Sequence, residues 1–507
     1  MIHSCSPRSG GLIASITALL LLGLSSVSLG QERNELTERS FWKSTPNLEQ
    51  VKASVANGND PSELGRYAFD PLSWALIERA PEDVLMYLLK QPGNDVNKLT
   101  HDGRTYIFWA AYRDNIAFMN TLISKGAKTD IIDSHGYSLL NFAAVTGQTN
   151  VALYDFIMEH GAQPASEVNH SGANALLLVA PFLENTELVD YFERHGLGLT
   201  SVDESGANFF HYAAKGGNIT FLSALLDRGF DANLLTLDGR NAGHYVAMGT
   251  RGKDNPVEAY HMMDSLGIDL TAPSKEGKTP LWYALQGEPS KETLNLLIGL
   301  GTQVHLSSDE GENALMVAAY SHDPTVLDLL MSNDIDINQT DDEGHSALTN
   351  AVRYNSPEAV SFLLEAGASV EPEDNGGALL QGLATAFNRD SAAFLEKAGL
   401  LMVRHFDFSA PQADGNTLFH LAVTEGNAGL CAVASQHGTD VNHLNSEGYS
   451  ALHLAAMQAE DSDIIEMLLD LGAKTDALTP FDETPLTLAK ENERLNSLPS
   501  ILNLLQP

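Results

Sequence analysis

The chain has 507 residues, of which 43% are hydrophobic, and it carries a formal net charge of −37 at pH 7. A single hydrophobic core rarely serves more than roughly 300 residues, so the length excludes one compact domain and leaves several domains or a repeat array. The excess of carboxylates disfavours nucleic acids and anionic membrane surfaces as partners, and it favours a cationic protein partner or a saline medium.

Residues 1–30 have the features of a secretory signal peptide. Arg8 precedes an apolar run over residues 12–24, and a stretch of small residues follows that run. Ser28 and Gly30 suit the small positions before a cleavage site, so cleavage is predicted after Gly30. The apolar run is shorter than the roughly 20 residues that span a bilayer. We therefore expect a periplasmic or secreted protein with no transmembrane segment in the mature chain.

The chain contains two cysteines, and Cys5 lies in the predicted signal peptide. The predicted mature chain keeps only Cys431, which excludes an internal disulfide, so its stability has to come from packing. Cys431 takes the place of a branched apolar residue in the sequence GLCAV over residues 429–433, and we expect it to be buried.

Residues 31–67 are predicted to form an N-terminal segment with a helical cap. Within it, residues 47–58 (NLEQVKASVANG) combine a helical apolar spacing with a terminal glycine. This stretch has no first helix before it, so we expect it to cover the N-terminal end of the array that follows.

A glycine followed by the start of a helix recurs through the rest of the chain. Successive glycines are 32 to 39 residues apart, and four of the ten spacings are 33 residues. A period near 33 is typical of few architectures, all of them repeat arrays. The glycines are Gly103, Gly136, Gly172, Gly206, Gly239, Gly277, Gly311, Gly344, Gly376, Gly415 and Gly448.

The residues around these glycines decide among the architectures. Gly277 is followed by KTPLWYA, Gly415 by NTLFHLA and Gly448 by YSALHLAA. Residues 359–368 (AVSFLLEAGA) and 464–473 (IIEMLLDLGA) have the apolar spacing of a second helix and contain a glycine suited to cap it. These units resemble ankyrin repeats, whose signature is a β-turn followed by Thr-Pro-Leu-His-x-Ala-Ala.

The resemblance implies an all-α fold, an ankyrin-repeat solenoid of about 13 helix-turn-helix units with short β-turn tips. Two degenerate units, starting near residues 68 and 482, extend the series of eleven glycines. Each helix pair cannot bury its apolar face alone, so the units have to stack on their neighbours.

Irregular spacings divide the array into predicted blocks. Residues 68–375 form the first block of repeats, and residues 415–507 form the C-terminal block and cap. Between them, residues 376–414 form an irregular repeat with an insertion over residues 400–412. Residues 251–255 are expected to lengthen the turn between the two helices of one unit.

No catalytic pattern accompanies the repeats. The motifs GxSxG, GxxxxGK, HExxH and CxxC do not occur in the sequence. We therefore expect that the chain is not an enzyme and that it binds no cofactor and no metal.

The histidines fall into two groups. Three of them occupy the histidine position of the ankyrin pattern, where the resemblance implies a hydrogen bond to the turn backbone: His211, His420 and His453. Three others lie at successive tips: His101, His135 and His170. Successive tips should be about one helix layer apart, roughly 8 to 10 Å, which is too far for ligands that lie about 2 Å from a shared zinc ion.

The resemblance implies that a protein partner docks on the tips and on the first helices. Tyr and Arg are enriched among the residues that dominate binding energy, and we expect the side chains of such a site to face away from the packing between units. The candidate partner-binding residues are His101, Asp102, Arg104, Tyr112, Arg113, His135 and Tyr137. If they do not bind, the next candidate is the inserted segment around Phe406 and Phe408.

The sequence thus indicates a non-catalytic scaffold or inhibitor that binds another protein in the periplasm or outside the cell. The alternative is an ankyrin effector that a bacterium secretes to act on a host. Both interpretations depend on the predicted signal peptide and on the absence of catalytic motifs.

Overall fold

The structure is a computed structural model that describes residues 34–370, 377–459 and 462–506. The predicted signal peptide at residues 1–30 and the tip glycine Gly376 lie outside the described residues. Within the described ranges the secondary structure is helical, and the β-structure consists of three isolated bridges. The prediction of an all-α fold is confirmed.

The contacts of the chain define two compact units, residues 1–275 and residues 276–507. Each unit is built from repeats of two short helices joined by a turn. The irregular repeat predicted at residues 376–414 falls inside the second unit.

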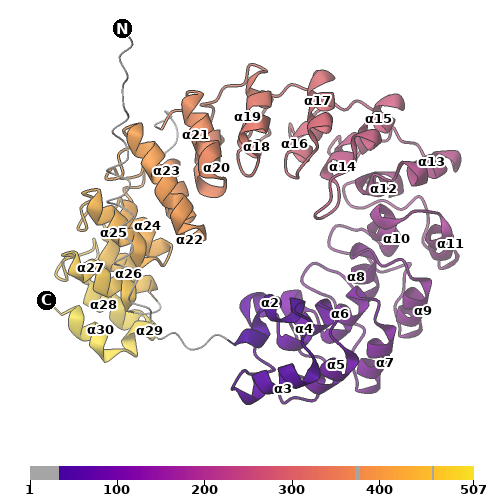
Figure 1. Cartoon of the computed structure of the whole chain (residues 1–507), viewed down its shortest axis with the longest axis horizontal. Coiled ribbons are helices and arrows are strands. Elements are labelled where there is room, and N and C mark those ends of the chain that lie inside the picture. Colours follow the sequence, from indigo (N-terminus) through magenta and orange to yellow (C-terminus); the bar gives the residue numbers. More distant parts are fainter. Residues whose placement is uncertain (1–33, 371–376, 460–461, 507) are drawn as a thin grey trace, which may run out of the picture. The chain divides into compact units, whose positions relative to one another are not determined.

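In the first unit, the first helix of each repeat contacts the first helix of the next, and the second helices form another row (Figure 1). The elements are η1 (Glu35–Thr37), α2 (Arg39–Lys43), α3 (Leu48–Ala56), η2 (Arg66–Ala68), α4 (Pro71–Ile77), α5 (Glu82–Leu89), η3 (His101–Gly103), α6 (Tyr106–Tyr112), α7 (Ile116–Ser124), α8 (Leu139–Val145), α9 (Val151–Glu159), α10 (Ala175–Val179), η4 (Ala180–Phe182), α11 (Glu187–Arg194), α12 (Phe209–Gly216), α13 (Ile219–Asp227), α14 (Ala242–Met248) and α15 (Val257–Ser265). The turn between α14 and α15 is lengthened as predicted and contains the bridge between Thr250 and Lys253.

The second unit repeats the same arrangement and ends in three short helices. Its elements are α16 (Pro280–Ala284), α17 (Lys291–Gly299), α18 (Ala314–Ala318), α19 (Pro324–Met331), α20 (Ala347–Tyr354), α21 (Pro357–Glu365), α22 (Ala378–Arg389), α23 (Ser391–Val403), α24 (Leu418–Thr424), α25 (Ala428–Gln436), α26 (Ala451–Gln458), α27 (Asp463–Asp470), α28 (Pro485–Glu491), α29 (Glu493–Asn496) and α30 (Pro499–Leu504).

Side-chain caps set where the first helices begin. At α26 the Ser450 side chain accepts from the His453 N–H, while His453 Nδ1 accepts from the Ser450 N–H at 3.1 Å. The other ring nitrogen, Nε2, lies 3.1 Å from the Ala477 carbonyl of the following repeat. His211 and His420 make the equivalent pair of bonds, so the predicted structural role of these three histidines is confirmed. One imidazole thus caps its own helix and joins it to the next unit.

Part of the insertion predicted over residues 400–412 is helical. Helix α23 has 13 residues and continues to Val403, so it takes up the beginning of residues 400–412. Leu401 continues the buried face of the helix at 0% exposure, whereas the last residue, Val403, is 76% exposed. Phe408 is buried and stacks on His437 with ring centroids 4.4 Å apart. That packing makes Phe408 a poor candidate for binding a partner.

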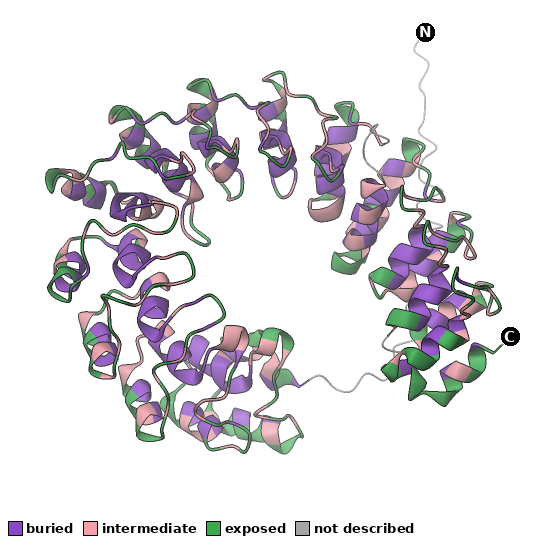
Figure 2. Ribbon diagram, turned by 180° about the vertical axis from the view of Figure 1, so that it is seen from behind, coloured by how far each residue is buried: buried purple, intermediate pink, exposed green. Residues whose placement is uncertain are grey.

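Buried residues are concentrated on the helices, mainly on the first helix of each repeat (Figure 2). Leucine and alanine are the commonest of these residues, and large and small side chains together fill the space between neighbouring helices. Cys431 is fully buried in α25, and burial raises the pKa of its thiol to about 12. The predicted core position of Cys431 is confirmed.

Candidate protein-binding surface

Main-chain hydrogen bonds join the tips of the first unit. Asp102 and Gly103 have φ values of 56° and 72°, which turn the chain sharply before α6. The Ser134 N–H of the next tip donates to the Asp102 carbonyl at 2.9 Å. Equivalent bonds join later tips: Glu204 to Ser171, Leu237 to Ser205 and Lys275 to Asp238. These bonds place equivalent residues of successive tips side by side.

Arg104 lies in a buried ion-pair cluster between two tips. Its Nε and Nη2 are each 2.7 Å from Asp133 Oδ2, and its Nη1 is 3.1 Å from Asp102 Oδ2. The guanidinium group also lies 5.5 Å and 4.6 Å from the ring centroids of Trp109 and Phe142. The Arg104 side chain is only 9% exposed, so the prediction that it faces away from the packing was wrong. The physical reason is the fully buried Asp133 carboxylate of the next repeat, which requires a cationic partner.

The two histidines of the cluster meet at Asp102. His101 Nε2 and His135 Nε2 lie 3.3 Å and 3.1 Å from Asp102 Oδ2, the oxygen that Arg104 also contacts. They are therefore closer together than the predicted helix-layer spacing, which was wrong for this pair. His101 stacks on Phe69, whereas the His135 side chain is 56% exposed. His135 is thus the member of the cluster most accessible to a partner.

Tyr112 and Arg113 lie at the other end of α6 from the tips. Arg113 Nε donates to the Ile77 carbonyl at 2.5 Å, and its guanidinium lies 4.5 Å from the Tyr112 ring centroid. Both residues are half-buried. Helix α6 is about 10 Å long, so the seven candidate residues divide into a tip cluster and this pair. Tyr137, half-buried beside His135 at 6.2 Å between ring centroids, belongs to the tip cluster.

A row of exposed aliphatic side chains runs along the same tips and was not predicted. Each member lies four residues before a tip glycine, and the exposed fractions range from 51% to 62%. We call it the aliphatic row, and its members are Leu99, Ile132, Val168, Val202 and Leu235. The residue after each member turns into the tip, as fully buried Asp133 does after Ile132. The row therefore forms an apolar strip on one side of the linked tips.

The sequence contained a signal for this row. Five successive units carry Leu, Ile or Val at one register position, and the glycine series gave that register. In the second unit the same position holds Ser307 and Thr340 before Leu444 and Leu478. Exposure could not be read from the sequence, because apolar residues at a recurring position more often form a core.

The repeat architecture also matches a known family. A model of the family described as ankyrin repeats matches residues 72–168, 259–341, 281–374 and 390–479, which together cover more than half of the chain. The chain belongs to the ankyrin-repeat family. The ankyrin resemblance deduced from the glycine series is thereby confirmed.

Similar proteins share these repeats over part of their length. Ankyrin repeat protein nuc-2 of Neurospora crassa is 25% identical over 241 residues, which cover 47% of this chain and 22% of that protein. Rabankyrin-5 of Homo sapiens is 24% identical over 442 residues, which cover 86% of this chain and 28% of that protein. Transient receptor potential cation channel subfamily A member 1 of Homo sapiens is 23% identical over 349 residues, which cover 54% of this chain and 31% of that protein. The chain thus spans less than a third of the length of each of these relatives.

Ankyrin repeats support a protein–protein interaction scaffold, and proteins built from them are in general non-catalytic. In this chain the tips expose aliphatic side chains next to His135, whose side chain is 56% exposed, and apolar groups flanked by polar ones are typical of protein interfaces. Among the residues that the structure describes, none of the helices combines the length and the apolar character needed to cross a membrane.

Proposed function

We propose that this ankyrin-repeat chain is a non-catalytic scaffold or inhibitor that binds a protein partner along the tips of its first unit, in the periplasm or outside the cell. The aliphatic row carries the proposal. Five half-exposed aliphatic side chains recur at one position of five successive tips that main-chain hydrogen bonds join, and grouped apolar side chains mark interaction sites more often than isolated ones do.

The row contributes part of the binding energy, and other contacts have to supply the rest because association itself costs roughly 4 to 15 kcal/mol. Covering a half-exposed Leu, Ile or Val contributes about 1 kcal/mol, so the whole row contributes about 5 kcal/mol before the cost of association. His135 and Tyr137 lie in the neighbouring tip cluster and can supply directed polar contacts at the edge of the strip. Arg104 acts indirectly, since its buried guanidinium holds two tips in place and is not available to a partner.

The proposed cellular location rests on the predicted signal peptide, and the acidic charge bears on the nature of the partner. A net charge of −37 suits a partner with a basic surface, which it would attract over long range. Periplasmic extraction by osmotic shock, followed by mass spectrometry of the N-terminus, tests the location. A protein that starts at Met1 and stays with the cytoplasmic fraction would contradict it.

Affinity capture with matched variants tests the surface. Tagged protein starting at Gln31 should retain its partner from a cell-envelope extract, and a triple variant with Leu99→Asn, Ile132→Asn and Val168→Asn should lose it while remaining helical by circular dichroism. Ile219→Asn, which changes a 41% exposed aliphatic residue on α13 of the same unit, should retain it. Equal capture by the triple variant and the wild type would move the site elsewhere.

Titration with the captured partner then measures how much the pair Tyr112 and Arg113, at the other end of α6 from the tips, contributes to affinity. Tyr112→Ala should weaken binding by about 2 kcal/mol, roughly thirtyfold in Kd, if this half-buried tyrosine contributes as interface tyrosines commonly do. Arg113→Ala is less informative, because the bond to Ile77 means that its loss also loosens the preceding repeat. A Kd for Tyr112→Ala within twofold of the wild type would restrict the surface to the tips.

A further inference from the structure

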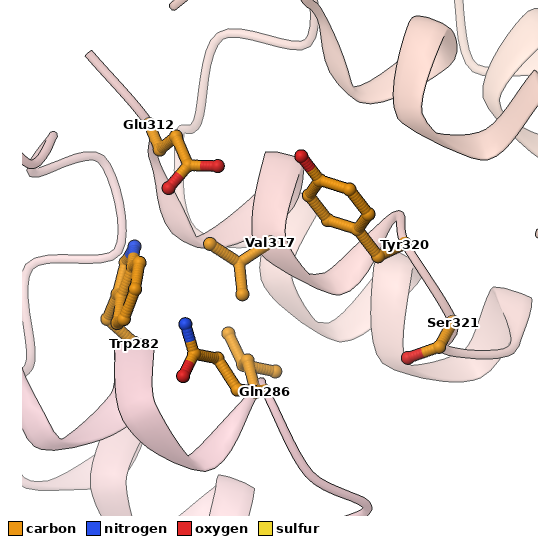
Figure 3. Close-up of a pocket in the computed structure, with 7 residues that line it drawn as sticks. Trp282, Gln286, Glu312, Val317, Tyr320 and Ser321 are labelled. Atoms are coloured by element: carbon orange, nitrogen blue, oxygen red, sulfur yellow. The ribbon is translucent and has the colours of Figure 1, made fainter. Parts of the chain in front are cut away.

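The second unit contains a hollow of about 300 Å³ between the ends of α16 and α18 (Figure 3). Its walls combine aromatic, carboxylate and amide groups. The lining residues are Trp282, Leu285, Gln286, Glu312, Val317, Tyr320 and Ser321. All of them belong to two neighbouring repeats, so the hollow is a property of that pair.

Trp282 has an unsatisfied donor at this hollow. Its side chain is 92% buried, since the residue is 8% exposed, and its indole Nε1 has no hydrogen-bond partner among the described residues. The ring edge that carries Nε1 is turned toward the end of the hollow occupied by Glu312 (Figure 3). The indoles of Trp42 and Trp109 donate to Leu36 O and Thr100 Oγ1, each at 2.8 Å, whereas Trp74 Nε1 is unsatisfied like that of Trp282 but does not line the hollow. A buried N–H without an acceptor is costly, so the Trp282 N–H favours an acceptor at this end of the hollow, either a water molecule or a carbonyl of a bound ligand.

The charge at the hollow is negative. Glu312 is half-buried, and burial, followed by the charges of Glu310 and Asp341, raises the pKa of its carboxyl group. The charges of Lys278 and His345 oppose this rise in the pKa of Glu312, while Lys278 Nζ also lies 3.4 Å from Glu276 and 3.3 Å from Glu310. The carboxylates of Glu276, Glu310, Glu312 and Asp341 outnumber Lys278 and His345, so an added cation near Glu312 would be stabilised.

The aromatic groups add a second reason for a cation. Lys278 Nζ lies 4.8 Å from the ring centroid of Trp282, which shows that this ring already accepts a cation on its face. Tyr320 supplies a further ring, and burial raises the pKa of its phenol to about 12, so the hydroxyl stays neutral. An aromatic wall next to a half-buried carboxylate is suited to a flat, weakly hydrated cation.

We propose that the hollow between α16 and α18 binds the guanidinium group of an arginine side chain that a protein partner presents. Its planar fork can donate to Glu312 and to the Gln286 side-chain oxygen while it stacks on an aromatic ring. A guanidinium has no acceptor for the Trp282 N–H, so the proposal also requires a main-chain carbonyl of the partner to accept this bond. This inference rests on the proposed scaffold function and names the chemistry of the partner at a second site.

The indole N–H signals of protein labelled with ¹⁵N-tryptophan test the proposal without a known partner. The probe is N-acetyl-arginine methylamide, and the Trp282 signal is assigned by its loss in Trp282→Phe. A saturable shift confined to the Trp282 signal is expected, because the other three tryptophans lie in the first unit. The neutral citrulline analogue should give no saturable shift, and the lysine analogue should bind at least fivefold more weakly.

Two variants that each remove one negative charge distinguish binding in the hollow from attraction of the probe by the overall negative charge of the chain. Glu312→Gln should weaken binding of the arginine probe at least tenfold. Asp309→Asn, an exposed residue of the same tip that does not line the hollow, should leave binding within twofold. Equal shifts from the arginine and citrulline probes, measured on the wild type, would overturn the proposal even if Glu312→Gln failed to fold. Failure of this test would leave capture through the aliphatic row unaffected, so the two proposals can be told apart.

Discussion

Replacing Arg104 with alanine should destabilise the repeats around it rather than merely remove a surface contact. The guanidinium makes two bonds of 2.7 Å to Asp133 Oδ2 and one of 3.1 Å to Asp102. Asp133 is fully buried, so the variant leaves its carboxylate without a cationic partner in the core of the tip. Removing one member of a buried pair costs about 3 to 5 kcal/mol.

The lower end of that range applies here. Asp133 Oδ1 still accepts from the N–H groups of His135 and Tyr137 at 2.9 Å, which leaves the carboxylate partly satisfied. We therefore expect a loss of about 3 kcal/mol for Arg104→Ala. Arg228→Ala is the matched control in the same unit. Its ion pair with Asp190 is exposed, and such pairs contribute at most about 1 kcal/mol.

Hydrogen–deuterium exchange measures this change locally. Amides of α6 and α8 should exchange roughly a hundredfold faster in Arg104→Ala, since about 1.4 kcal/mol corresponds to a factor of ten in the opening equilibrium. Arg228→Ala should accelerate exchange in α11 and α13 by about fivefold or less. A less than threefold change in Arg104→Ala would refute the argument that the ion-pair cluster holds the tips together.

Two further predictions concern the second unit. Burial lowers the pKa of His453 in the folded chain. Below about pH 6.5 the unfolded chain therefore binds a proton at this residue more readily than the folded chain does. The free energy of unfolding should accordingly fall as the pH drops from 7 toward 5. His453→Gln retains a capping side chain and should show a smaller drop in Tm over the same range; an equal drop would assign the effect to other groups. The second prediction compares two glycines with nearly equal φ, Gly277 and Gly438, whose φ values are 76° and 78°. A Cβ added at Gly277 would lie 2.5 Å from the Ser307 carbonyl oxygen, whereas a Cβ added at Gly438 would meet no atom within 4 Å. Gly438→Ala should cost about 1 kcal/mol in urea unfolding and Gly277→Ala clearly more, and equal costs would show that the tips can separate without strain.

The regular part of the fold could be predicted because its determinants are local. Glycine spacing, helix caps and apolar periodicity each lie within about 33 residues, and one helix pair can bury its apolar face only against its neighbours. The capping role of His453 followed from its place in the motif for the same reason. The irregular repeat was harder, because a longer α23 and a loop insertion lengthen the spacing between glycines equally.

The candidate site depended on contacts between repeats, which the sequence does not specify. Arg104 looked like an exposed tip residue, yet its main partner, Asp133, comes 29 residues later and was available only once two tips were stacked. Contacts between repeats likewise decide that the aliphatic row is exposed and that Trp282 and Glu312 line one hollow. The sequence by itself determined the repeat and therefore the helix pairs, because short-range caps and periodicity act within one unit. Only the tertiary structure decided which polar groups are buried and which apolar groups stay exposed, because burial depends on the neighbouring repeat that covers each side chain.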